Sequence, residues 1–386
     1  MLRAMVLVNK APGLAPGQRF RIEQWDAYLR REHGIVVEYQ PFESPRLTRV
    51  LYENGRAIEK AALVLRDAVR RRSIVRAARS HDVIVIYREA ALLGPPLYEW
   101  LLSRTRVPIV YDFDDAIWAL PKRTSVRIND AFRVLKFTGK TATICRLANA
   151  VTVGNEYLAS WAREHNPEVH VVPTSIELTA YPAQPPPLHD SPFTVVWSGT
   201  FSTLVHLEMA RRPLEQLARR RAVRLNVICD RPIARPIAGV DTRFIPWRAD
   251  AEAQSIATGH VGIMPLPDDE ITRGKCGCKA LQYMAAGRVA VAARIGVNSD
   301  IITHGENGFL ASSDDEWVEI LDLLANSGPL RERVAAAGRN TVKERFSAER
   351  SAALFARAIR RAVRGGSRQD AEAPGKSPRI AVGKSA

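Results

Sequence analysis

Two lysines near the start of a predicted helix, Lys275 and Lys279, are the residues best placed to bind a charged ligand. They lie in residues 274–310, where a glycine-broken loop leads into a helix, a buried strand and a second turn. Backbone N–H groups at a helix start attract anions, and a nearby lysine adds a full positive charge. The segment therefore predicts a site for a phosphorylated ligand, with an ordinary helix and solvated lysines as the alternative.

Three carboxylates, Asp112, Asp114 and Asp115, follow a short buried run of apolar residues. Acidic groups at the edge of a sheet are costly unless they are used or paired. One interpretation is that Asp112 and Asp114 form a DxD pair that chelates a divalent metal and a nucleotide diphosphate. We favour the other, in which the carboxylates recognise sugar hydroxyls and Asp115 caps the start of a helix.

The loops after the first and third predicted strands carry further candidates. Glycine lets the backbone approach a ligand closely, and arginine can hold a carboxylate or phosphate through two hydrogen bonds. Arg88 and Glu89 either contact a ligand or form a structural ion pair. We expect the acceptor of a reaction to be bound by five residues of these loops: Gly17, Arg19, Arg21, Arg88 and Glu89.

In the second half of the chain, Ser198, Gly199 and Thr200 follow another predicted strand. Gly199 allows close backbone approach, and Ser198 or Thr200 could cap a helix, so this loop is a second anion-site candidate. Together with the two lysines it would suit the two ends of a diphosphate. His206 lies just beyond on a predicted helix, where a lone histidine is more often structural or exposed than catalytic.

The elements that position these residues are apolar strands that alternate with helices, a pattern typical of parallel βαβ units. The strands lack polar alternation, which fits sheets covered on both faces. We predict two Rossmann-like domains facing each other across a cleft, with ligands at the carboxyl ends of the strands. The predicted parts are a first domain at 1–175, a proline-rich linker at 176–192, a second domain at 193–347, a last helix at 348–364 and a disordered tail at 365–386.

The charge balance is the compositional outlier. The 386 residues are 46% hydrophobic and 25% charged, as in soluble globular proteins, but the formal net charge is +15. Nucleic acid, an anionic membrane surface or a polyanionic substrate could each account for this excess. The basic residues are spread thinly and show no nucleic-acid-binding pattern, so no specific nucleic-acid partner is expected.

Several enzyme classes and locations lose support from the sequence. It contains no GxSxG, HExxH or GxxxxGK[ST] motif, which disfavours serine hydrolases, zinc proteases and P-loop ATPases. Its four cysteines make no metal-ligand pattern and are expected to be free thiols. The first residues contain no signal peptide, and no apolar stretch is long enough to span a membrane. We expect a cytoplasmic protein, or one peripheral on the inner membrane face.

The chain up to about residue 363 resembles the group 1 glycosyltransferases, which have the GT-B fold. The similarity rests on the blocks APGQRFR, IVYDFDDAIW, VVPTSIE and, most specifically, GKCGCKALQYMAAGRVAVAARIGVNSDIITHGENGFLA. The resemblance implies a first domain that binds the acceptor, a second that binds a nucleotide-sugar, and a last helix that crosses back to the first domain. It also implies a retaining reaction with no metal and no cofactor, the nucleotide-sugar being a co-substrate.

The chain departs from this family at two positions. Gly274 and Gln282 stand where many relatives carry two glutamates, so Lys275 and Lys279 would supply the positive charge. Gln282 would hydrogen-bond a ribose or sugar hydroxyl. The arginine and lysine that often follow the first strand of this domain are absent, and the DFDD sequence replaces a histidine of the first domain. The resemblance places backbone amides on the sugar or phosphate at four positions: Gly296, Val297, Asn298 and Ser299.

The combined prediction is a retaining, hexosyltransferase-like enzyme of polysaccharide biosynthesis. It would move a sugar from a nucleotide-diphosphate donor to a glycan or lipid-linked glycan, with peripheral contact to an anionic membrane. Asp114, Asp115, Lys275 and Lys279 are the predicted catalytic residues. The alternatives are a nucleotide-sugar epimerase or hydrolase, and a non-catalytic basic binding protein on the same fold.

Overall fold

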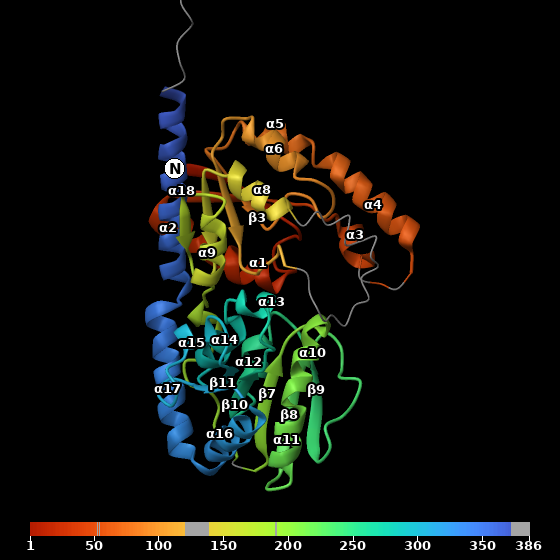
Figure 1. Cartoon of the computed structure of the whole chain (residues 1–386), viewed down its shortest axis with the longest axis vertical. Helices are drawn as coiled ribbons and strands as arrows, with labels where there is room; N and C mark the ends of the chain where they lie inside the picture. Colours follow the sequence, from red (N-terminus) through yellow and green to blue (C-terminus); the bar gives the residue numbers. More distant parts are fainter. Residues whose placement is uncertain (52, 54, 120–138, 190, 372–386) are drawn as a thin grey trace, which may run out of the picture.

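Two six-stranded parallel sheets organise the chain, one in each half of the sequence (Figure 1). The computed structural model describes residues 1–51, 53, 55–119, 139–189 and 191–371. Figure 1 shows the two sheets with their helices stacked end to end along the long axis of the molecule. This is the predicted α/β architecture of two Rossmann-like domains.

The first sheet has the strand order β2-β1-β3-β4-β5-β6. Its strands β3 and β4 are buried throughout, as continuous apolar runs in a doubly covered parallel sheet should be. The order reverses between β1 and β3, and ligands of open parallel sheets bind outside the carboxyl ends of strands at such a point. The strands are β1 (Leu2–Val8), β2 (Ile35–Pro41), β3 (Val83–Tyr87), β4 (Ile109–Phe113), β5 (Ala150–Val153) and β6 (Val169–Val171).

The second sheet has the order β12-β11-β10-β7-β8-β9, so its reversal lies between β7 and β10. The loops that follow these two strands lead to the predicted anion sites. The strands are β7 (Phe193–Ser198), β8 (Val223–Cys229), β9 (Val240–Pro246), β10 (Val261–Met264), β11 (Val289–Ala293) and β12 (Phe309–Ala311).

Helices cover both faces of each sheet. Alternate residues of β1 enter two different cores, because successive side chains of a strand point to opposite faces. The helices of the first half are α1 (Pro16–Arg21), η1 (Glu23–Trp25), α2 (Asp26–His33), α3 (Pro45–Val50), α4 (Ala57–Arg70), α5 (Ser73–Ala78), α6 (Leu97–Ser103), α8 (Lys140–Leu147), α9 (Glu156–Arg163) and η2 (Leu178–Ala180). Those of the second half are η3 (Phe201–Thr203), α10 (Leu204–Leu207), η4 (Glu208–Ala210), α11 (Arg211–Ala218), α12 (Glu252–Ile256), α13 (Glu270–Arg273), α14 (Cys278–Ala285), α15 (Asn298–Ile301), α16 (Asp314–Asn326), α17 (Gly328–Arg345) and α18 (Ala348–Ala371).

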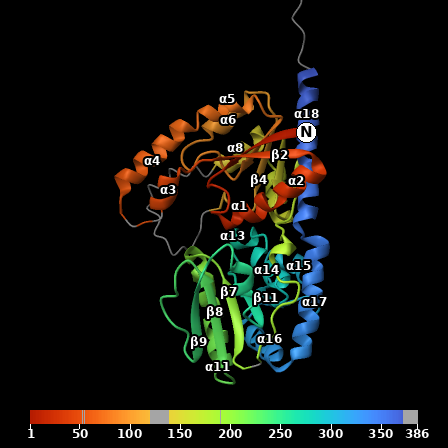
Figure 2. The same cartoon turned by 180° about the vertical axis from the view of Figure 1, so that it is seen from behind.

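The last helix, α18, packs on the first domain. Its Phe355 ring lies 5.1 Å from that of Trp25, and Arg360 donates to the carbonyl of His33 at 2.7 Å. Figure 2 shows α17 along the second domain and α18 along the first, on one side of the molecule. Helix α18 continues to Ala371, beyond the predicted end of the last helix at residue 364. Residues 372–386 of the predicted tail lie outside the described residues.

A fully buried ion pair connects α1 to the centre of the first sheet. Arg21 donates to both carboxylate oxygens of Asp112 on β4 and to the carbonyl of Val172, and Thr152 donates to Asp112 at 2.6 Å. Burial raises the pKa of Asp112, and the charge of Arg21 opposes this shift. The prediction that Arg21 binds an acceptor is therefore wrong, because its guanidinium is completely buried and each of its three nitrogens donates within the protein. The DxD interpretation is wrong for the same reason. Both carboxylate oxygens of Asp112 accept hydrogen bonds from Arg21, so they are not available to a metal ion.

This pair leads to a stability prediction. Replacing Arg21→Met leaves a buried carboxylate with no counter-charge and should lower the free energy of unfolding by about 3–5 kcal/mol. The double variant Arg21→Met/Asp112→Asn removes the stranded charge and should recover much of that loss. Urea unfolding followed by circular dichroism measures both. The exposed control Arg31→Met should change stability by less than about 0.5 kcal/mol, and equal losses in the single and double variants would contradict the account.

Candidate functional site

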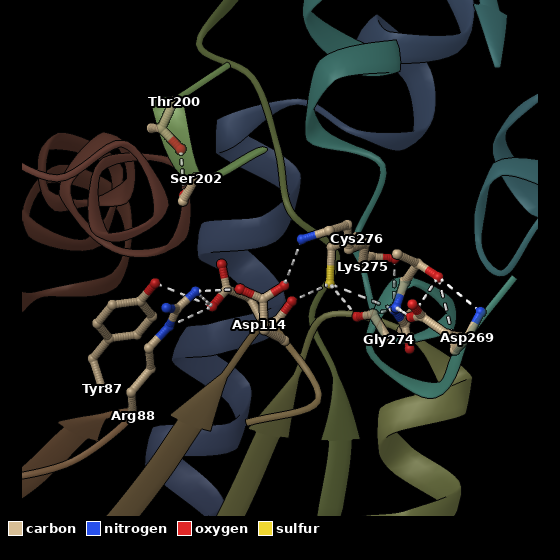
Figure 3. Close-up of polar contacts among 12 residues, drawn as sticks. Tyr87, Arg88, Asp114, Thr200, Ser202, Asp269, Gly274, Lys275 and Cys276 are labelled. Atoms are coloured by element: carbon tan, nitrogen blue, oxygen red, sulfur yellow. Dashed lines mark hydrogen bonds and ion pairs between the residues drawn. The ribbon is translucent and has the colours of Figure 1, made fainter. Parts of the chain in front are cut away.

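The candidate site lies where residues that follow β3 and β4 meet the loop between α13 and α14 of the second domain. Figure 3 shows Tyr87, Arg88 and Asp114 on the first-domain side, with Lys275 and Cys276 next to Asp114. The structure thus brings the predicted carboxylates of one domain to a predicted lysine of the other.

Arg88 organises the first-domain half of the site. Its guanidinium donates to Asp114 at 2.7 and 3.0 Å and to Asp115 at 2.7 Å. The Tyr87 hydroxyl also donates to Asp114, at 3.1 Å. Arg88 has a left-handed backbone, with φ of 62°, held by hydrogen bonds from its amide and to its carbonyl. A non-glycine residue in this region costs free energy and needs such support, which is a frequent feature of functional sites.

Gly17 completes this half because only glycine fits its position. A Cβ at Gly17 would lie 2.8 Å from the Tyr87 hydroxyl and 3.6 Å from a carboxylate oxygen of Asp114. The first-strand loop therefore packs directly over the residues after β3 and β4, and contact of Gly17 with an acceptor stays a prediction. The predicted helix cap at Asp115 is not found, since residues 114–119 form bends and turns.

Asp115 connects the two domains electrostatically. Its second carboxylate oxygen lies 3.7 Å from the Lys275 ammonium. Burial alone would raise the pKa of Asp115, but the charges of Lys275 and Arg88 outweigh it and hold that pKa below its usual range. Asp115 is therefore ionised at neutral pH and can only accept hydrogen bonds.

The loop that carries Lys275 is packed tightly into the first domain. A Cβ at Gly274 would lie 2.7 Å from that of Ala116, and one at Gly154 would lie 2.1 Å from the Cys276 sulfur. Asn155 donates to the carbonyls of Gly274 and Lys275, each at 3.1 Å. Gly274, which stands in place of a family glutamate, therefore leaves room for contact between the domains.

Lys279 lies in the first turn of α14, with its ammonium 5.3 Å from the centre of the Trp197 ring. Burial, followed by the nearby charge of Lys275, lowers the pKa of Lys279 to about 8. Helix α14 begins after Gly277, which has φ of 67° and gives no side-chain cap. The two lysines thus stand at an uncapped helix start, as predicted for an anion site.

His206 on α10 is a site residue to which the sequence gave no functional role. Burial, followed by the charges of Lys279 and Lys275, lowers its pKa to about 4. Its buried Nδ1 has no hydrogen-bond partner among the described residues. His206 is therefore neutral at pH 7 and offers an unused polar atom beside the lysines. Its distance along the chain from them hides this from sequence reasoning.

The loop after β7 differs from its prediction. The amides of Ser198, Gly199 and Thr200 already donate within the protein, to the Tyr283 hydroxyl, the Ile228 carbonyl and the Thr203 hydroxyl. Gly199 is required because a Cβ there would lie 2.4 Å from the Trp197 ring. These amides are therefore engaged within the protein and do not form a second anion site. Thr200 is the N-cap residue of η3, as the prediction for Ser198 or Thr200 allowed.

The second domain can be assigned to a family once this geometry is considered with the sequence. Residues 192–326 match the family model described as glycosyl transferases group 1. This second domain therefore resembles the group 1 glycosyltransferases. The family predicted from the sequence blocks is confirmed. No curated protein sequence matches the chain.

Solved structures show that the chain has the predicted GT-B fold. Sucrose-phosphate synthase of Thermosynechococcus elongatus is 14% identical with a TM-score of 0.66, and the match covers 93% of this chain and 98% of that one. HepE of Anabaena, solved with UDP and glucose, is 16% identical with a TM-score of 0.62, covering 93% and 100%. A glycosyltransferase from Rickettsia africae is 13% identical with a TM-score of 0.62, covering 93% and 98%.

The remaining predicted donor residues are mostly engaged within the protein. Gln282 is 3% exposed, and its amide donates to the Tyr181 hydroxyl at 3.4 Å. The amides of Asn298 and Ser299 donate to the carbonyls of Ile295 and Gly296. These contacts contradict the predicted roles of Gln282, Asn298 and Ser299.

The neighbouring amides of Gly296 and Val297 differ, because no acceptor contacts them among the described residues. A Cβ at Gly296 would lie 2.7 Å from the Arg273 carbonyl, so glycine is required at this turn. These two amides remain candidates for contact with a donor.

Two predicted acceptor residues form structural ion pairs. Arg19 pairs with Glu252 of α12 and thereby joins the two domains. Glu89 pairs with Lys140 at 3.3 Å. The prediction that Arg19 and Glu89 bind an acceptor is wrong for this arrangement, whereas Arg88 remains in the site.

Two kinds of feature are absent from the described residues. No three His, Cys, Asp or Glu side chains in the described part lie close enough together to hold a metal ion. No helix in the described ranges is long and apolar enough to cross a bilayer.

The packing of Gly274 yields a prediction. Gly274→Glu restores the residue type of many relatives but should separate the domains, because its Cβ would clash with Ala116. We expect an increased radius of gyration in small-angle X-ray scattering and a lower melting temperature. The neighbouring control Arg273→Glu, whose side chain is exposed and pairs only with Asp268, should keep the wild-type radius. A Gly274→Glu protein with unchanged scattering and stability would contradict the packing argument.

Proposed function

We propose that the chain is a retaining glycosyltransferase that moves a sugar from a nucleotide-diphosphate donor to a glycan or lipid-linked glycan. One observation carries the proposal: Lys275 and Lys279 stand at the uncapped start of α14, opposite the Arg88–Asp114–Asp115 cluster of the other domain. The complexes of HepE with UDP-glucose, and with UDP and glucose, support a donor of this class.

The lysines would stabilise the leaving diphosphate. Negative charge develops on it as the bond to the sugar breaks, and preorganised cations in a water-poor site stabilise such charge strongly. Lys279 is already desolvated, as its lowered pKa of about 8 reflects. A bound phosphate would therefore supply the counter-charge that Lys279 lacks. The free amides at the start of α14 would contact the same oxygens.

The carboxylates would position the sugars. Asp115 is ionised, and Arg88 fixes it beside Asp114, so both can accept hydrogen bonds from sugar hydroxyls. Contact between the domains would exclude water and hold donor and acceptor in reacting geometry. Because Arg88 and Lys275 already neutralise these carboxylates, we propose that the transfer uses no metal. We also propose that it uses no other cofactor and takes place in the cytoplasm.

The assignment of the lysines can be tested by removing their charge. The double variant Lys275→Met/Lys279→Met should lower kcat/KM for donor turnover roughly 10²–10³-fold, the usual loss when electrostatic stabilisation of a leaving group is removed. Mass spectrometry of a panel of nucleotide-sugars identifies the donor, and the same assay then compares the variants.

The matched control is Lys343→Met, an exposed lysine on α17, which should keep wild-type turnover. Unchanged turnover in a folded Lys275→Met/Lys279→Met protein would remove the proposed site. Rapid conversion of the donor to a new sugar without any acceptor would favour an epimerase or hydrolase.

The lowered pKa of Lys279 predicts a pH dependence of donor binding. With a pKa of about 8, Lys279 is mostly charged at pH 7 and mostly neutral at pH 9. A phosphate favours the charged form, so affinity for UDP should fall about tenfold over this interval. Titration calorimetry at both values measures this. Lys279→Arg, which stays charged, should show a much smaller fall, and a pH-independent wild-type affinity would show that Lys279 does not contact the phosphates.

A further inference from the structure

Helix α4 carries an uncovered row of large apolar side chains. Ile58, Leu65 and Val69 are 88%, 67% and 51% exposed. Their spacing places them on one face of the helix, since neighbours on a helix surface recur every three or four residues. Leu63 and Asp67, on the other side of the helix, are buried against the domain. Exposed apolar rows of this kind mark interaction surfaces.

The helix is also strongly basic. The segment from Arg56 to Arg72 contains six basic and two acidic residues. The two acids are paired locally, Glu59 with Arg46 and Arg56, and Asp67 with Arg66. Arg70 donates to the Phe42 carbonyl at 2.8 Å, and its charge also acts on Asp67. Arg71 is buried, so the basic side chains that reach the surface are the other five. The apolar row is thus accompanied by excess positive charge.

The exposed apolar side chains and the positive charge of α4 indicate which kind of partner it binds. A second copy of the same face is disfavoured, because it would oppose two sets of like charges. Helix α4 lies at the outer edge of the first domain, away from α18 in both views (Figures 1 and 2). An amphipathic helix with apolar and basic faces is suited to a membrane interface, where it inserts apolar side chains and attracts anionic headgroups.

We propose that α4 docks the protein on an anionic lipid bilayer, with Ile58, Leu65 and Val69 inserted among the lipid headgroups and acyl chains. The docking does not depend on the donor site, which lies on other elements. It gives the first domain, the proposed acceptor domain, the position nearest the lipid.

Vesicle co-sedimentation of the full chain tests the docking. The wild-type protein should bind vesicles of phosphatidylcholine mixed with phosphatidylglycerol and should bind pure phosphatidylcholine much more weakly. Ile58→Glu/Leu65→Glu should weaken binding to the anionic vesicles at least about tenfold, because two inserted side chains become charged. The control Met209→Glu/Leu323→Glu makes the same charge change at two exposed apolar residues of the second domain and should bind like the wild type.

Insertion can be observed directly at the helix. A fluorescent label on Ile58→Cys should show a blue-shifted emission on anionic vesicles and be quenched by lipids brominated in the acyl chain. The same label on Leu323→Cys should show neither change. Equal binding by the α4 variant and the control would overturn the proposal. So would a wild-type dimer that Ile58→Glu/Leu65→Glu dissociates and that does not bind vesicles.

Discussion

The candidate site depends on the close contact between the 274–276 loop and the first domain. Gly274 rests on Ala116, and Cys276 fills the space beside Gly154. The Cys276 thiol donates to the carbonyl of Asp114 at 3.0 Å, and burial raises its pKa, so it remains protonated and able to donate. The lysine between these two contacts has little freedom to leave Asp115. Backbone packing, not the charge pair itself, therefore places positive charge opposite the carboxylates.

The contact between the domains places different charges around the two halves of the site. Asp115 is surrounded by the cations of Arg88 and Lys275, whereas Lys279 has a second lysine and an aromatic ring nearby. The lysine pair is thus incompletely neutralised in the structure. A buried cation without a counter-charge is costly, and an anionic ligand relieves that cost.

The fold was largely predictable from the sequence because its strands are unbroken apolar runs and its helices alternate with them. Positions that depend on a local pattern, such as the lysines before α14, were also predictable. Contacts between residues distant in the chain were not. Arg21 meets Asp112, Arg19 meets Glu252, and each looks like a ligand-binding arginine until its partner is seen.

The amides after β7 show that the contacts of backbone groups with distant residues are equally hard to predict. The sequence indicates a strand followed by a loop with glycine, which is common to anion sites and to plain structural turns. The difference lies in whether the amides have acceptors. At Ser198 the acceptor is the hydroxyl of Tyr283, which comes from α14 and cannot be inferred from the loop itself. Glycine is required at position 199 because the Trp197 ring leaves no room for a Cβ, and not because a ligand must approach the backbone.

The net charge of +15 has little to do with the site. At the site, Arg88, Lys275 and Lys279 face two carboxylates, Asp114 and Asp115, so most of the excess charge lies elsewhere. On α4 that charge occurs together with exposed apolar side chains, a combination that a donor site does not need. Positive charge thus occurs in two physically different settings, the domain interface and helix α4. A few desolvated cations act on a small anion at the domain interface, and many hydrated ones act over a longer range on an extended anionic surface.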